Sequence, residues 1–230
     1  MTAEADRSGE LFDDWPEKYE RWFETPIGAL VKEYETRLLL DMLQPAGNET
    51  ILDVGCGTGI FTFDVLAAGA AVVGMDISEP MIGFAANRFR SQKFTSLTGD
   101  MSHFPFTANS FDKVYSMTAV EFVSDARQVI SELERVTRPG GTIVLTTLNG
   151  LSPWAEKRLE KAKQGHELFQ SMTFRTPAEL RRLVPDSAVL KTAIHFRKEE
   201  DPVQARRAEV EGDADGRETG AFLAACWTNK

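Results

Sequence analysis

The stretch Ile51-Leu52-Asp53-Val54-Gly55-Cys56-Gly57-Thr58-Gly59 decides the fold of this chain. A short apolar run ends in alternating glycines, a pattern typical of a buried strand that enters a tight turn. Glycines between a strand and a helix let a ligand approach the backbone closely near the helix N-terminus. The next expected strand leads to Asp76, and an acid in that place can accept hydrogen bonds from both hydroxyls of a ribose. The stretch therefore predicts a nucleoside site.

Two details of this turn argue against a dinucleotide cofactor. The pyrophosphate-binding pattern is G-x-G-x-x-G, and Gly59 comes one residue too early for it. Asp53 lies immediately before the turn, where its carboxylate would repel a pyrophosphate but suit a cationic amino group. The turn favours a nucleoside that carries positive charge.

Strands and helices alternate regularly after this point. Apolar runs predict strands at 50–54, 71–75, 94–97, 112–116 and 142–148, and helical spacing predicts helices at 61–68, 79–90 and 124–137. Such alternation implies a parallel sheet that is covered by helices on both faces. We expect a Rossmann-like, doubly wound α/β sheet of seven strands, mostly parallel with one antiparallel strand.

The flanking segments complete one expected domain, residues 1–230. Residues 10–45 predict a cap of two helices interrupted at 25–28, and residues 50–148 form the expected core. Residues 149–230 add helices, one of them at 178–183, and strands at 189–196 and 221–228. Between those strands, 197–218 hold five basic and eight acidic residues, which predicts a solvated excursion or a flexible linker.

Composition narrows the class of partner. The formal net charge of −9 argues against a nucleic-acid binder, which normally presents a basic patch. No apolar run reaches the ~18 residues of a membrane span, and the first residues do not resemble a secretory signal. Cys56 and Cys226 form no metal-binding or disulfide pattern, so a reducing cytoplasm is the expected location and no metal site is expected.

The chain resembles the class I S-adenosylmethionine-dependent methyltransferases, in particular their small-molecule branch of type 11 and quinone-biosynthesis enzymes. Four segments carry the resemblance at the family's spacings: 51–59, 72–78, 99–112 and the Arg-Pro-Gly-Gly turn at 138–141. The resemblance implies S-adenosyl-L-methionine as the cofactor. It also implies transfer of a methyl group to an O, N, C or S atom of an acceptor.

The resemblance assigns roles to individual residues. The methionine part of the cofactor would be held by Asp53 and the Gly55, Cys56, Gly57 and Gly59 turn, the ribose by Asp76, and the adenine by Ile77, Met81, Asp100 and Met101. Met117 or Thr118 would lie under the sulfonium, and Tyr19 would close over the cofactor. No catalytic base stands out; His166, in the variable region after the fifth strand, is a weak candidate.

Several assignments have structural alternatives. Asp76 could cap a helix, Asp100 could stabilise a turn, and Ile77 and Met81 could be ordinary core residues. The aromatic residues Trp15, Tyr19, Trp22 and Phe23 could form core or a lid over the acceptor.

The acceptor itself is left open by the sequence. The acidic charge and the aromatic N-terminal segment favour a small, partly apolar molecule. The alternatives are a methyltransferase of RNA or protein, for which Arg175, Arg181 and Arg182 are the local basic cluster, and a noncatalytic cofactor-binding module. The oligomeric state stays open as well.

Overall fold

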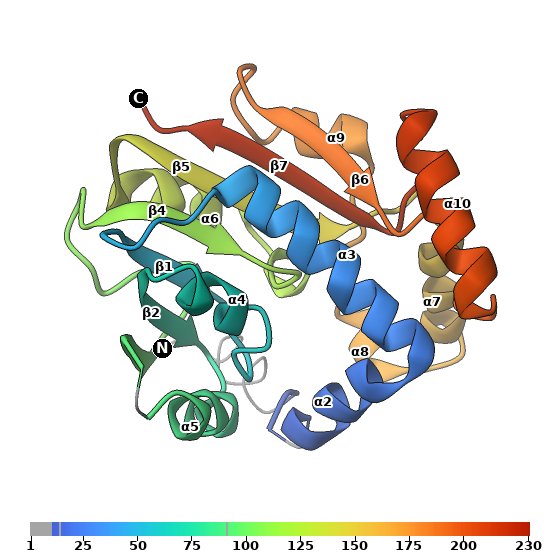
Figure 1. The fold of residues 1–230 in the computed structure, drawn as a ribbon, viewed down its shortest axis with the longest axis horizontal. Coiled ribbons are helices and arrows are strands. Elements are labelled where there is room, and N and C mark those ends of the chain that lie inside the picture. The colour runs from blue at the N-terminus through green and yellow to red at the C-terminus, as the bar shows by residue number, and fades with distance from the viewer. Residues whose placement is uncertain (1–10, 14, 91) are drawn as a thin grey trace.

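A computed structural model describes residues 11–13, 15–90 and 92–230. Its centre is a seven-stranded sheet of order β3-β2-β1-β4-β5-β7-β6 (Figure 1). The strands are β1 (Thr50–Val54), β2 (Ala71–Asp76), β3 (Phe94–Thr98), β4 (Phe111–Ser116), β5 (Thr137–Leu148), β6 (Val189–Ala193) and β7 (Phe222–Thr228). β7 runs antiparallel to both of its neighbours, β5 and β6, and the other pairs are parallel. The expected architecture is confirmed.

Helices cover both faces of this sheet (Figure 1). They are α2 (Pro16–Glu24), α3 (Pro26–Leu43), α4 (Thr62–Ala67), α5 (Glu79–Arg88), α6 (Ala126–Val136), α7 (Pro153–Lys163), α8 (Glu167–Gln170), α9 (Pro177–Arg181) and α10 (Pro202–Ala214), with a 3-10 turn η1 (Val120–Phe122). One core cluster joins the sheet to α3, α4 and α10, and the other joins it to α6 and α9.

Most helix starts follow from local sequence. An Asp, Ser or Thr side chain accepts a hydrogen bond from the first helical turn, and proline occupies one of the first two helical positions, in α3, α5, α7, α9 and α10. Thr176 and Glu179 form a reciprocal capping box at α9. These caps fix where the chain leaves the sheet and turns back over it.

The segment 197–218 differs from the sequence prediction. It contains α10, a 13-residue helix, instead of a solvated excursion or flexible linker. Its inward side buries Ala205, Glu209 and Gly212, and Glu209 accepts hydrogen bonds from the N–H groups of Ile194 (3.0 Å) and His195 (2.6 Å). The number of charged residues predicted no packed helix here. The helix packs nonetheless, because its few inward positions hold small residues and an acid that accepts hydrogen bonds from backbone N–H groups.

The start of β5 also differs from expectation. The strand begins at Thr137 and includes the Arg138–Gly141 turn that we expected to precede it. Gly140 has φ +78° and donates its N–H to the carbonyl of Asn229, so this turn is tied to the chain's C-terminal end. Among the described residues no helix is both long and apolar enough to cross a membrane.

Candidate functional site

The carboxyl ends of β1, β2 and β4 open into one cavity of about 760 Å³. Parallel sheets bind ligands at this edge, where strand order reverses between β1 and β4. Helices α2, α3 and α7 and the segment before α2 form the other walls. The cavity contains every predicted cofactor residue except Gly59: Tyr19, Asp53, Gly55, Cys56, Gly57, Asp76, Ile77, Met81, Asp100, Met101, Met117 and Thr118.

The glycine turn requires glycine for its backbone conformation and for close packing. Gly55, Gly57 and Gly59 have φ of +71°, +53° and +79°, which favour glycine. A Cβ at Gly55 would meet the Ala119 side chain at 2.4 Å, and one at Gly59 would meet the Phe89 ring at 2.4 Å. Gly59 therefore lets the turn pack on α5 and its end instead of lining the cavity.

Asp53 presents a free carboxylate oxygen at the end of β1. Its Oδ2 accepts hydrogen bonds from Thr62 Oγ1 (2.6 Å) and Tyr115 Oη (2.7 Å), while its buried Oδ1 has no partner among the described residues. Burial raises the pKa of Asp53 to about 7, against the lowering effect of these two hydrogen bonds. A buried oxygen without a partner is costly, so this one suits a ligand donor such as an ammonium group.

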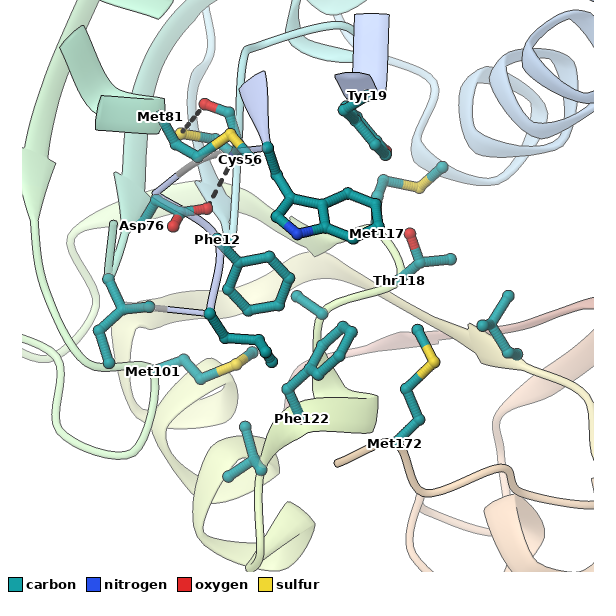
Figure 2. A pocket seen from close by; sticks show the side chains of 18 of the residues that line it. Phe12, Tyr19, Cys56, Asp76, Met81, Met101, Met117, Thr118, Phe122 and Met172 are labelled. Carbon is teal, nitrogen blue, oxygen red and sulfur yellow. Dashed lines mark hydrogen bonds between the residues drawn. The ribbon is translucent and has the colours of Figure 1, made fainter. Parts of the chain in front are cut away.

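Asp76 ties the tip of β2 to the glycine turn. Its Oδ2 accepts from the Gly57 N–H at 2.8 Å and its Oδ1 from the Ser78 N–H at 3.0 Å. Burial raises its pKa, and these backbone donors oppose the rise. Ser78, not Asp76, caps α5. Figure 2 shows Asp76, Cys56 and Met81 together at one end of the cavity.

The adenine candidates lie beside them. Met81 is buried and Ile77 half-buried, and both line the cavity. Asp100 also lines it, and its Oδ1 accepts from the Ser102 N–H at 2.8 Å, the turn contact that we gave as its alternative role. The two roles are compatible because the carboxylate has a second oxygen.

Thr118 stands in a strained conformation after β4. Its φ is +44°, rare for a β-branched residue, and its N–H donates to Thr146 Oγ1 at 2.9 Å. Met117 beside it is buried, and both face the cavity (Figure 2). Such strain is characteristic of functional positions.

The N-terminal segment covers the cavity. Leu11, Phe12, Trp15 and Tyr19 line it, and the Phe12 ring meets the Phe122 ring edge-to-face at 4.8 Å (Figure 2). Glu20 connects helix α2 to the rest of the protein. Its carboxylate forms an ion pair with Arg88 at 2.5 Å and accepts a hydrogen bond from Thr58 Oγ1. Trp22 and Phe23 also line the cavity, so the aromatic set of α2 faces the ligand space as well as packing on the core.

Other candidates lie elsewhere. His166 is exposed at the start of α8, stacked on Phe169 at 4.2 Å, and does not line the cavity. Arg175 is buried and donates to the carbonyls of Val120 and Thr173, and Arg181 donates to the carbonyl of Ala188. These two arginines serve the fold rather than a basic face.

Sequence reasoning missed two charged residues that line the cavity, Glu35 on α3 and Arg158 on α7. Glu35 is buried, and burial raises its pKa to about 8 although Arg158 lowers it. The sequence did contain a signal for Glu35. It lies four residues after Val31 and four before Leu39, so helical spacing places it on the apolar face of its helix.

Comparisons with known proteins agree with this geometry. Residues 52–145 match the family described as "Methyltransferase domain". A malonyl-[acyl-carrier protein] O-methyltransferase of Erwinia pyrifoliae is 37% identical over 110 residues, which is 48% of this chain and 41% of that protein. The chain thus spans less than half of that relative's length. An uncharacterized protein of Mycobacterium bovis is 28% identical over 90% of this chain and 69% of its own length.

Solved structures share the whole fold at low identity. A methyltransferase of Thermotoga maritima has a TM-score of 0.70 at 20% identity, covering 97% of this chain and 100% of its own. The geranyl diphosphate C-methyltransferase of Streptomyces coelicolor has a TM-score of 0.69 at 18% identity, covering 100% of this chain and 99% of its own. These structures confirm the expected fold, and the match over residues 52–145 agrees with the resemblance stated from the sequence.

Proposed function

We propose that this chain, whose residues 52–145 carry a methyltransferase domain, transfers a methyl group from S-adenosylmethionine to a small, partly apolar molecule. The observation that carries the proposal is the cavity itself. It brings the glycine turn, Asp53 and Asp76 to one end, beside a chamber with aromatic walls.

The residues present fit this cofactor. The unpartnered Asp53 Oδ1 suits its amino group, the open turn at Gly55 and Gly57 suits its methionine part, and the Asp76 carboxylate suits its ribose. When bound, S-adenosylmethionine supplies an activated methyl group on a positively charged sulfur.

The protein's own contribution is positioning and exclusion of water. Thr118 and Met117 fix the backbone below the reacting centre, and Tyr19 and Trp15 cover it. Holding two reactants in line can supply up to about 7–11 kcal/mol in ideal cases. Closure of the aromatic segment also removes water from the reaction space.

The proposal of a small, partly apolar acceptor is supported by the residues of the cavity walls and by the names of the relatives. Trp22, Phe23, Phe61 and Trp154 give an apolar chamber that suits a small molecule. By their names, the relatives above act on malonyl-[acyl-carrier protein] and on geranyl diphosphate, neither of which is a nucleic acid. We therefore favour a small organic acceptor over RNA.

Calorimetric titration with S-adenosylmethionine and, separately, with NAD tests the cofactor. We expect micromolar affinity for the first and no heat of binding for the second, because Asp53 repels a pyrophosphate at the turn. Binding of NAD, or no binding of S-adenosylmethionine, would contradict the proposal.

A further inference from the structure

One part of the cavity contains none of the residues that we assign to the cofactor. It is the acceptor chamber, which we define by Trp22, Val31, Glu35, Trp154, Arg158 and Ile194. The rings of Trp22 and Trp154 stack at 6.3 Å, and the Arg158 guanidinium lies 5.5 Å from the Trp154 ring. Glu35 and Arg158 are the charged members of this otherwise apolar chamber.

The Arg158 side chain forms no hydrogen bond and no ion pair with any described residue, and its guanidinium lies over the Trp154 ring. It is also the single Lys, Arg or His side chain among the described residues that line the cavity. Its guanidinium offers five donors and the residue is half-buried, whereas the buried Arg175 donates to backbone carbonyls. Burial lowers the pKa of Arg158, which is the expected cost of removing an unpaired cation from water.

The nearby carboxyl groups of Glu35 and Glu121 attract this cation and so oppose the lowering of its pKa by burial, but neither is paired with it. Burial raises the pKa of Glu35 to about 8 and that of Glu121 to about 7, so at neutral pH both hold much of their proton. Neither forms an ion pair with Arg158 within 4.0 Å. A protonated Glu35 is in addition a hydrogen-bond donor toward an anion.

Further cations lie on the surface outside this chamber, at the exposed residues Lys157, Lys161 and Lys198. The Lys198 ammonium is 5.7 Å from the ring of Trp22, and its pKa is lowered by burial and then by Lys161, Arg158 and Lys157. Glu199 pairs with Lys157 at 2.6 Å. Acids alternate with these lysines, at Glu156 and Glu160 on α7 and at Glu199, so it is Arg158, inside the cavity, that points to an anionic ligand.

We propose that the methyl acceptor carries an oxyanion, a carboxylate or a phosphate, that binds Arg158 while its apolar body packs against Trp22 and Trp154. This inference rests on the proposed function, since it assigns the acceptor of that same cavity. Arg158 is then a specificity-determining residue. The guanidinium fork matches the two oxygens of such a group.

Four matched probes test the charge of the acceptor: 3-phenylpropionate, 2-phenylethyl phosphate, 3-phenylpropionamide and 2-phenylethylamine. Each is titrated by ligand-observed NMR into the full chain saturated with S-adenosylhomocysteine. We expect the carboxylate or the phosphate to bind about tenfold or more tightly than the amide, the scale of a charge-assisted hydrogen bond. Whichever of the two binds more tightly identifies the kind of oxyanion.

Two variants locate the effect. Arg158→Gln should abolish the preference for the anionic probes, and Lys163→Gln, an equal charge change at an exposed position of the same helix, should retain it. If Arg158→Gln does not fold, Arg158→Lys should keep the preference in weakened form. The comparison of probes on the unaltered chain needs no variant at all.

The outcomes separate this inference from the proposed function. Failure of the unaltered chain to bind S-adenosylhomocysteine would contradict the proposed function. Cofactor binding with equal affinity for the carboxylate and the amide, tighter binding of the amine, or no binding of any probe would overturn the oxyanion inference alone. A preference that survives in Arg158→Gln would overturn the role of Arg158.

Discussion

At the scale of single residues, the cofactor half of the cavity depends on a few carboxylates held by backbone. Asp76 is the clearest, because it supports the Gly57 N–H and also lines the cavity. Under our assignment of the ribose to Asp76, this one side chain links the shape of the turn to cofactor binding.

Asp76→Asn should weaken binding of S-adenosylmethionine by about 1.5–3 kcal/mol, or roughly 10- to 150-fold in Kd, the scale of hydrogen bonds to a charged group. The amide keeps one oxygen acceptor, so the turn should persist. Calorimetry on this variant and on Asp64→Asn, a half-buried acid outside the cavity, measures the difference. An unchanged Kd in Asp76→Asn would contradict the ribose assignment.

Glu35 makes the stability of the cofactor-free protein depend on pH. Its pKa rises on folding from 4.5 to about 8, chiefly through burial, with Glu121 adding to the rise and Arg158 opposing it. The folded state therefore holds the proton more tightly. The stabilisation is complete below about pH 4.5 and is lost as the pH rises toward 8.

Glu35→Gln should therefore flatten this dependence, by on the order of 3 kcal/mol between pH 5 and pH 8. Urea unfolding of both proteins at several pH values, without cofactor, checks it. Equal pH slopes for the two proteins would show that Glu35 does not titrate across this range.

The sequence could predict the cofactor residues because their spacing along the chain sets their place in space. Asp53 and Asp76 lie at the carboxyl ends of β1 and β2, and Asp100 follows β3, so the sheet brings the three acids to one edge. Glu35 and Arg158 lie on helices far apart in sequence, and their meeting depends on how α3 and α7 pack. Gly59 does not line the cavity: its φ of +79° is also what lets the turn pack closely against the Phe89 ring, a role that the sequence pattern does not distinguish from contact with a ligand.

At the scale of elements, α10 supports one wall of the cavity. Ile194 lines the cavity with φ of +66°, rare for a β-branched residue, and Glu209 accepts its N–H. The His195 side chain packs against Gly212, where an added Cβ would meet it at 2.2 Å. Composition did not reveal this helix because a surface helix needs few apolar residues when its inward side binds backbone.

Glu209→Ala should destabilise the protein by about 1–3 kcal/mol, because it leaves two backbone N–H groups without their acceptor. Arg206→Ala on the same helix removes only an exposed pair with Glu33 and should cost less than about 1 kcal/mol. Thermal or urea unfolding measures both. Equal effects of the two changes would mean that Glu209 does not hold the Ile194 turn.

At the scale of the whole molecule, the sheet order brings the proposed cofactor residues and the proposed acceptor chamber into one cavity. The alternation of strands and helices made this architecture predictable, since parallel strands need helical crossovers. The closing helices α2, α3 and α7 were less predictable. Their apolar faces indicate that these helices pack on the core. The pattern does not indicate which of their residues face a ligand.

Transfer of a labelled methyl group tests the central claim most directly. The protein is incubated with methyl-labelled S-adenosylmethionine and, in separate reactions, with a metabolite extract below 3 kDa, total RNA and a protein fraction, with Asp76→Asn as the control. We predict label in the small-molecule reaction, strongly reduced in the variant. Label in RNA or protein instead, or label that is equal in the variant, would contradict the account.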